Sequence, residues 1–176
     1  MKRLSSPRTI LAVDPGKKKC GMALFVNERL TVATLLTADN TFLLGKNVWL
    51  WWLKQAEDRV LDPKLDRLVT EGQVVYPGLR TANPNDLLPL SYLCGAVQAR
   101  VEAEETLMPL PREWKGSLKK ELFTRQILSR LHKEELAIVD QVKCPKGELH
   151  NVVDAVGLGL WAMGAIRLHP PKNEVV

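Results

Sequence analysis

The stretch Thr9-Ile10-Leu11-Ala12-Val13-Asp14-Pro15-Gly16 places a carboxylate directly after an apolar run. Such a run is typical of a strand that is covered on both faces of a sheet, and the Pro-Gly pair predicts a turn. Three lysines, Lys17, Lys18 and Lys19, follow at once. A carboxylate at a strand end beside a lysine cluster suits a site that holds metal ions against phosphates. An aspartate that only bonds its own turn explains this motif equally well.

Four more strands are predicted along the chain. Residues 20–26 and 29–37 are predicted to form the second and third strands, with a turn at Asn27-Glu28 between them. The first three strands therefore form two successive hairpins. Residues 66–71 form a fourth strand, which again ends on a carboxylate, Glu71. A short fifth strand covers residues 106–110. Hairpins connect the first three strands, and longer connections that contain helices join the later strands. This order indicates an α/β fold with a mixed sheet.

Helical periodicity predicts four helices, over residues 45–61, 87–101, 117–131 and 147–168. Asn83-Pro84 is a typical start for the second of them. In the first, an apolar stripe is formed by Trp49, Trp52, Leu53, Ala56 and Val60. This stripe predicts packing on the sheet. The additional area of Leu50 and Trp51 is a possible dimer contact.

The composition limits the class of protein. With 176 residues, of which 45% are hydrophobic, we expect one domain over residues 1–176. The net charge of +5 and a pI of about 9.2 favour a polyanionic partner. Three widely spaced cysteines argue against a zinc site and against a disulfide framework, and thus for a reducing cytoplasm. No apolar run is long enough to span a membrane, and the N-terminus lacks the apolar region of a signal peptide.

The strongest local charge bias lies between residues 112 and 133, where only two glutamates oppose the basic side chains. A solvated helix face is the usual interpretation of such a run. A face that contacts phosphates is the alternative, and its nearness in sequence to a site loop favours it. The basic residues are Arg112, Lys115, Lys119, Lys120, Arg125, Arg130 and Lys133.

The last helix carries His150, Asn151 and Asp154, which share one helix face near its N-terminus. Burying an unpaired carboxylate is costly, so Asp154 needs a partner, either a metal ion or a salt bridge. Glycines in this helix lower its intrinsic stability, and they predict that it lies close against the sheet. That approach would bring Asp154 towards the strand ends.

Three carboxylates therefore converge if the first and fourth strands are neighbours: Asp14, Glu71 and Asp154. Hard divalent cations prefer such oxygen ligands. Two ions about 4 Å apart can activate a water molecule and stabilise the leaving oxygen of a phosphodiester.

The chain resembles the RuvC-like Holliday-junction resolvases of the RNase H-like superfamily, in particular short bacteriophage versions. Each matching motif is weak alone, but together they occur in family order and span nearly the whole chain. The matching segments are Ile10 to Gly16, Val69 to Gln73, Trp114 to Lys120 and His150 to Ala155.

The resemblance implies an RNase H-like fold with a mixed five-stranded sheet flanked by helices. It implies a homodimeric Mg²⁺-dependent nuclease, with Mn²⁺ as a substitute, that nicks two strands of a four-way DNA junction symmetrically. Asp14, Glu71 and Asp154 would bind two metal ions. The residues expected to contact DNA are Lys17, Lys18, Lys115, Lys119 and Lys120, together with the loop from Gly72 to Asn83.

One departure from the family concerns the position three residues before Asp154. The family often has an aspartate there, and this chain has Asn151. Asn151 can still bind a metal ion through its carbonyl oxygen, and His150 can act as a ligand or as a general acid or base. The missing acid also leaves open a non-catalytic binding module of the same fold.

Two other classes of protein share part of this sequence pattern. A related nuclease that acts on RNA would use the same acids, and fold alone does not select the substrate. An actin-like nucleotide-binding fold also begins its phosphate loop with Asp-x-Gly, but the chain is too short for the two lobes of that site.

Overall fold

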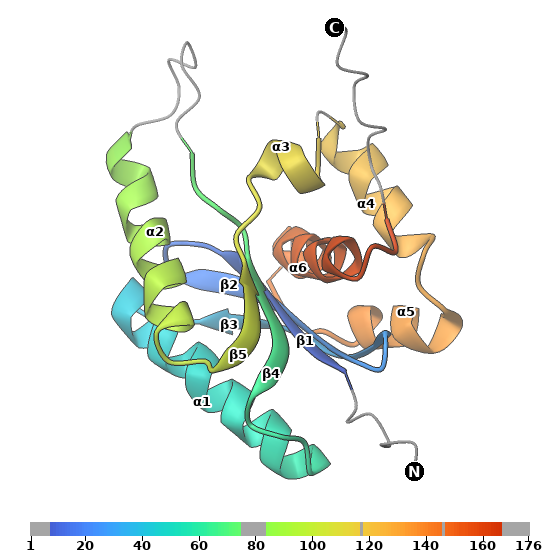
Figure 1. Ribbon diagram of the computed structural model, residues 1–176. Helices are drawn as coiled ribbons and strands as arrows, with labels where there is room; N and C mark the ends of the chain where they lie inside the picture. Colours follow the sequence, from blue (N-terminus) through green and yellow to red (C-terminus); the bar gives the residue numbers. More distant parts are fainter. Residues whose placement is uncertain (1–7, 75–83, 117, 146, 167–176) are drawn as a thin grey trace, which may run out of the picture.

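The computed structural model describes residues 8–74, 84–116, 118–145 and 147–166. The chain alternates strands and helices in the order expected for an α/β protein (Figure 1). The elements are β1 (Thr9–Pro15), β2 (Lys19–Val26), β3 (Arg29–Thr37), α1 (Thr41–Arg59), β4 (Leu65–Thr70), α2 (Pro84–Gln98), β5 (Ala103–Leu107), α3 (Pro111–Trp114), α4 (Lys120–Leu128), α5 (Lys133–Asp140) and α6 (Leu149–Ala162).

The five strands form one mixed sheet in the order β3-β2-β1-β4-β5, which confirms the predicted fold class. The strands β1, β2 and β3 are antiparallel neighbours, whereas β4 runs parallel to both β1 and β5. The β2–β3 turn uses Asn27 and Glu28 with φ of 50° and 66°, which matches the predicted hairpin. The required adjacency of the first and fourth strands is confirmed, with Val13 beside Thr70.

Helices cover both faces of the sheet (Figure 1). One core joins α1 and α2 to the face that carries Leu11, Val13 and Leu68. The other core joins α6 and α4 to the face that carries Ile10, Ala12 and Val69. Because successive side chains of a strand point to opposite faces, Asp14 belongs to the α6 face. Glu71 follows Val69 at the same spacing and belongs to that face too.

The helix α6 lies very close to the sheet, as its glycines predict. A Cβ atom on Gly21 would overlap the carbonyl group of Asn151 and lie 2.9 Å from the backbone nitrogen of Val152. A Cβ atom on Gly159 would lie 3.0 Å or less from the Phe25 ring. Gly164 has no such contact, and its φ of 73° places it in the turn after the helix. Gly21 faces Asp14 across the β1–β2 pair, so this contact sets the height of α6 above the site.

Several predicted boundaries were wrong. Helix α1 begins at Thr41, because Asn40 caps it by accepting from the Leu43 amide. It ends at Arg59, and Val60 is 93% exposed in a left-handed conformation instead of belonging to the buried stripe. Strand β5 covers residues 103–107, and the last helix ends at Ala162. The predicted cap at Asn83 and most of the loop from Gly72 lie outside the described residues.

The predicted helix over residues 117–131 is also wrong in extent. Gly116 has a φ of 67° and separates the short helix α3 from α4, which begins at Lys120. A further helix, α5, follows at residues 133–140. Within α1, Trp52 is 1% exposed and its indole nitrogen donates to the carbonyl of Pro63 at 2.9 Å. Trp49 and Trp51 are half-buried against the same core. The tryptophans therefore serve mainly the interior.

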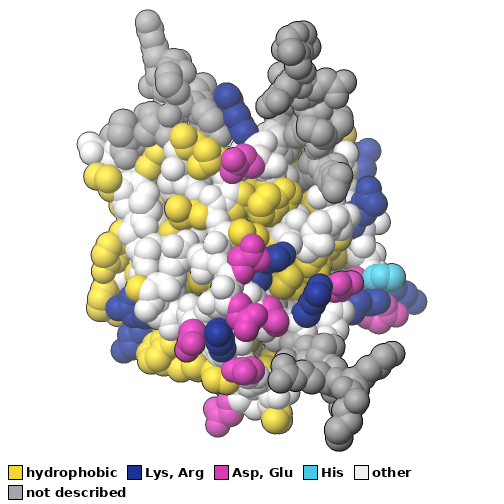
Figure 2. Space-filling model, in the orientation of Figure 1, with side chains coloured by type: hydrophobic (Ala, Val, Ile, Leu, Met, Phe, Trp, Pro, Cys, Tyr) yellow, Lys and Arg dark blue, Asp and Glu magenta, His cyan; other side chains and the backbone are white. Residues whose placement is uncertain are grey.

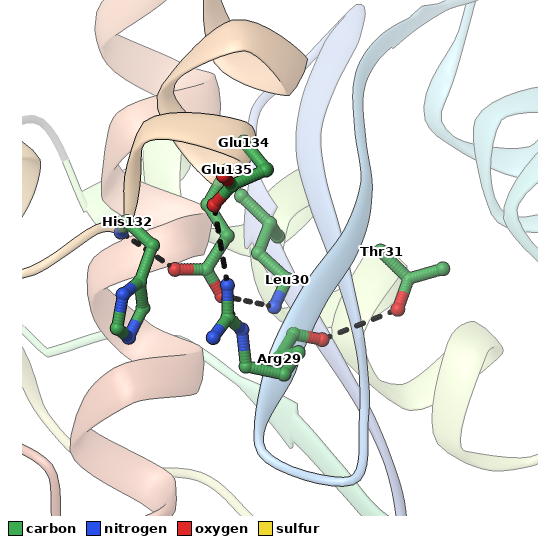
Figure 3. Close-up of polar contacts among 6 residues, drawn as sticks. All are labelled: Arg29, Leu30, Thr31, His132, Glu134 and Glu135. Atoms are coloured by element: carbon green, nitrogen blue, oxygen red, sulfur yellow. Dashed lines mark hydrogen bonds and ion pairs between the residues drawn. The ribbon is translucent and has the colours of Figure 1, made fainter.

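A buried glutamate fastens α5 to the sheet (Figure 3). Glu135 is 5% exposed and accepts from the backbone amide of Leu30 at 2.8 Å and from Arg29 Nε at 3.1 Å. Its other oxygen accepts from the backbone amide of His132 at 2.8 Å, which caps α5. These bonds satisfy the charge and account for its burial. In the described part of the chain, no helix combines the length and the apolar character needed to cross a membrane.

We predict that Gly21→Ala lowers the free energy of unfolding by about 2 kcal/mol or more, because α6 must move away from β2. Gly95→Ala is the matched control, since a Cβ atom there meets nothing within 4 Å and Gly95 lies inside α2. It should stabilise the protein by about 0.5–1 kcal/mol. Urea denaturation measures both, and equal effects of the two substitutions would contradict the close approach of α6.

Candidate active site

Asp14 lies at the end of β1 and is only 8% exposed. On one side, Asp14 pairs with Gly21 of β2. On the other side, Val13 pairs with Thr70 of β4, so the neighbour of Asp14 is the residue that follows Thr70. That residue is Glu71, whose amide donates to the carbonyl of Val13 at 3.3 Å. The parallel pairing of β1 and β4 therefore brings these two carboxylates to the same sheet edge and the same face.

Glu71 is fixed through both its backbone and its carboxylate. Its carbonyl oxygen accepts from Gln73 Nε2 at 3.0 Å and from the Cys94 thiol at 3.5 Å. Its Oε1 accepts from the indole nitrogen of Trp114 at 3.1 Å. Trp114 is 1% exposed and packs edge-on against Phe123, with ring centroids 5.3 Å apart. A buried indole donor thus orients the Glu71 carboxylate.

Asp154 is paired with Lys115. The helix α6 places Asp154 in its second turn, 9% exposed, and the Lys115 ammonium nitrogen lies 2.5 Å from Asp154 Oδ2. The same nitrogen lies 4.9 Å from the Phe123 ring centroid and 5.4 Å from that of Trp114. Lys115 is therefore held by one carboxylate and two aromatic faces. From the sequence, either a metal ion or a basic side chain could pair with Asp154. In this structure the partner is the ammonium group of Lys115, in a salt bridge.

The three carboxylates interact electrostatically. Burial raises the pKa of Asp14 well above its usual value, and the charges of Glu71 and Asp154 raise it further, while Lys115 opposes the shift. Burial also raises the pKa of Glu71, against the opposing effects of Lys115 and the Trp114 hydrogen bond. The structure thus brings together the three acids that the sequence singled out, with one ammonium group among them. Clustered groups with shifted pKa values of this kind are common at functional sites.

Carboxylate oxygens are the ligands that a hard divalent cation prefers, and a cation would relieve their mutual repulsion. In this structure the ammonium group of Lys115 supplies the positive charge. Among residues 8–74, 84–116, 118–145 and 147–166, no three acidic, histidine or cysteine side chains are arranged to hold a metal ion together. Burial raises the pKa of Cys94 to about 11 and that of Cys20 still further, so neither thiol offers a thiolate ligand at neutral pH.

His150 and Asn151 lie at the start of α6, but their side chains are directed to that helix end. His150 Nδ1 lies 2.6 Å from the carbonyl oxygen of Gly147. Asn151 Nδ2 donates to Glu148 Oε2 at 2.9 Å, and Glu148 also pairs with Lys19. The backbone of Asn151 presses on Gly21, beside Asp14. In the described part of the chain, no hydrogen bond joins the side chain of His150 or Asn151 to the three acids.

The lysines that were predicted to contact DNA have different surroundings. Lys17 pairs with Asp86 at 2.5 Å, which ties the β1–β2 turn to the start of α2. Lys18, Lys119 and Lys120 are exposed, the last two at the start of α4. Lys115 alone reaches the acids. Acidic and basic side chains are interspersed over β4 and β5 (Figure 2), where Arg67 and Glu105 pair at 2.5 Å.

Two residues of the site were not among those predicted from the sequence. Trp114 was noted only as part of a motif, although an indole beside a basic residue could have indicated a donor for a nearby carboxylate. Glu148 lies three residues before Asn151, and this helical spacing could have indicated their hydrogen bond.

Comparisons with known proteins support the fold. No family model and no curated protein sequence matches the chain. Thermus thermophilus RuvC in complex with a Holliday junction substrate is 13% identical, with a TM-score of 0.57 over 89% of this chain and 96% of that chain. A second Thermus thermophilus RuvC structure is also 13% identical over the same shares, with a TM-score of 0.52.

The yeast mitochondrial Holliday junction resolvase Ydc2 is 12% identical, with a TM-score of 0.50 over 92% of this chain and 83% of that one. The chain therefore has the fold of the RuvC-type structures. The motifs quoted from the sequence agree with this assignment, since they lie on β1, β4, α3 and α6 in the same order.

We predict that Asp14→Asn stabilises the metal-free protein at neutral pH. The folded-state pKa of Asp14 is raised, so its ionisation costs stability as the pH rises from the ordinary aspartate value through the folded-state value. The difference in unfolding free energy between variant and wild type should widen with pH, reaching about 1–2 kcal/mol. Urea denaturation in EDTA across about pH 4 to about pH 8 measures it. A difference that is constant with pH, or that favours the wild type, would refute the shift.

Proposed function

We propose that the protein is a divalent-metal-dependent endonuclease that resolves four-way DNA junctions by symmetric nicking. The observation that carries this proposal is the meeting of three carboxylates and one ammonium group at the carboxyl edge of β1 and β4. The likeness of the fold to Holliday junction resolvases supports the choice of branched DNA as substrate. A mixed sheet alone would be compatible with many activities.

In this proposal Asp14, Glu71 and Asp154 bind two Mg²⁺ ions, for which Mn²⁺ can substitute. The bound ions would activate the attacking water molecule and stabilise the leaving oxygen. Trp114 holds Glu71 in place through its indole nitrogen. Asn151 offers its carbonyl oxygen as a further ligand, since its amide nitrogen is already bonded to Glu148.

Substrate binding would use the basic side chains around this edge. Lys119 and Lys120 are exposed at the start of α4, and Lys17 and Lys18 lie in the β1–β2 turn. These residues would neutralise backbone phosphates, which gives binding without sequence preference and a strong salt dependence. His150 is assigned the role of general acid or base, because it lies four residues before Asp154 on α6 and therefore on the same face of that helix.

We predict that the wild-type protein nicks a labelled four-way junction in paired, symmetric positions, and only with Mg²⁺ or Mn²⁺. A matched linear duplex should stay intact. Asp14→Asn should abolish cleavage and keep junction binding, because it removes a metal ligand and leaves the basic surface unchanged. Asp140→Asn, at the exposed end of α5, is the control for the loss of one negative charge.

Three outcomes would contradict the proposal or part of it. Cleavage that persists in Asp14→Asn would exclude the carboxylate cluster as the active site. Tight junction binding by the wild type without nicks in either metal would indicate a binding module instead. Cleavage of branched RNA in preference to branched DNA would change the assigned substrate.

Symmetric nicking requires two active sites, and we assign the outer face of α2 as the surface where a second copy binds. Leu88 is 65% exposed and Tyr92, one turn later, is 51% exposed. Two such faces could approach closely and bury their apolar side chains. The tryptophans of α1 contribute less, because Trp52 is buried.

We predict that Leu88→Glu and Tyr92→Glu convert a dimer to a monomer, because a charge would be buried at the contact. Leu50→Glu is the control on α1, where Leu50 is 44% exposed. Sedimentation velocity measures the oligomeric state. Dissociation by Leu50→Glu but not by the α2 variants would move the interface to α1, and a wild-type monomer would refute the dimer.

A further inference from the structure

Lys115 has an unusual position for a residue that is expected to contact DNA. Its ammonium group lies 2.5 Å from Asp154 Oδ2 and against the rings of Trp114 and Phe123, and its side chain is only 25% exposed. The exposed lysines that follow it, Lys119 and Lys120, have no such enclosure. In this state the Lys115 charge is directed inwards, to the acids, and not to the solvent where a phosphate would approach.

The charge balance explains this position. Three carboxylates at one sheet edge repel one another, and the Lys115 charge acts on Asp14 and Glu71 as well as on Asp154. A divalent cation bound by the same acids would carry out the same neutralisation more fully. An ammonium group and a metal ion next to the same carboxylate would repel each other. Lys115 and the cation therefore compete for Asp154.

We propose that Lys115 is a built-in competitor of the divalent cation: its ammonium group neutralises the acids in the metal-free protein and leaves Asp154 when the metal binds. This inference rests on the proposed function only in taking the three acids as the metal site. The ammonium nitrogen of Lys115 lies over the rings of Trp114 and Phe123, and the long, flexible side chain can swing outwards from them.

The exchange couples metal binding to DNA binding. Once it has left Asp154, the ammonium group of Lys115 is free to contact a backbone phosphate, which gives it a second role at the same site. By thermodynamic linkage, metal should then tighten junction binding, and junction should tighten metal binding by the same factor.

The first test is calorimetric titration of Mn²⁺ into the free protein at about pH 8. Lys115→Met should bind Mn²⁺ about fivefold more tightly than the wild type, the factor that corresponds to one partly exposed ion pair. Lys115→Arg keeps the charge and should stay within about twofold of the wild type. Lys133→Met controls for the loss of one positive charge from an exposed position on α5. Unchanged or weaker Mn²⁺ binding by Lys115→Met would overturn the inference.

The second test needs no variant. Acetylation of lysine amines, read by mass spectrometry, reports how free each ammonium group is. Saturating Mg²⁺ should increase the labelling of Lys115 several-fold relative to Lys133. Equal labelling of Lys115 with and without Mg²⁺, in a protein that calorimetry shows to bind Mg²⁺, would overturn the exchange.

The two proposals fail differently. If the wild type binds no Mn²⁺ or Mg²⁺ with or without junction DNA, the metal-dependent nuclease is refuted, and the exchange with it. If metal binds and junctions are cut, but Lys115→Met binds Mn²⁺ no more tightly than the wild type, only the exchange is wrong.

Discussion

Repulsion among three carboxylates at one sheet edge is the constraint on which the site depends. Asp14 and Asp154 are each less than a tenth exposed, so water screens their charges little, and burial together with the neighbouring acids raises the pKa of Asp14. Lys115 relieves part of this repulsion. Such an arrangement is destabilising for folding, and the divalent cation that we propose for this site would relieve the repulsion.

The rest of the fold holds the acids in place. Parallel pairing of β1 with β4 puts Asp14 beside Glu71, and the missing side chain of Gly21 lets α6 bring Asp154 down to them. From the other side, α3 supplies Trp114 to Glu71 and Lys115 to Asp154. Trp114 and Lys115, adjacent residues at the end of α3, thus hold Glu71, which follows β4, and Asp154, which lies on α6. The buried contact between Trp114 and Phe123 joins α3 to α4.

The sequence predicted the parts of the fold that depend on local pattern. The β1 strand, the hairpin at Asn27-Glu28 and the convergence of the three acids followed from apolar runs, turn residues and helix spacing. The short helix α3 and the later start of α4 at Lys120 were missed, because a basic segment of helix-forming residues does not show where one helix ends and the next begins. The shift of β5 to residues 103–107 depends on pairing with β4. The partners of Glu71 and Asp154 come from tertiary contacts across 43 and 39 residues, which no local pattern encodes.

The most direct measurement is the anomalous scattering of Mn²⁺ in crystals of the protein grown with the metal. The account predicts an anomalous peak in contact with carboxylate oxygens of Asp14, Glu71 and Asp154, with the Lys115 ammonium group withdrawn from Asp154. Junction DNA in the crystal should strengthen a second peak near Asn151. Crystals that bind Mn²⁺ only elsewhere, with the Lys115–Asp154 ion pair intact, would contradict the assignment of this sheet edge as the metal site.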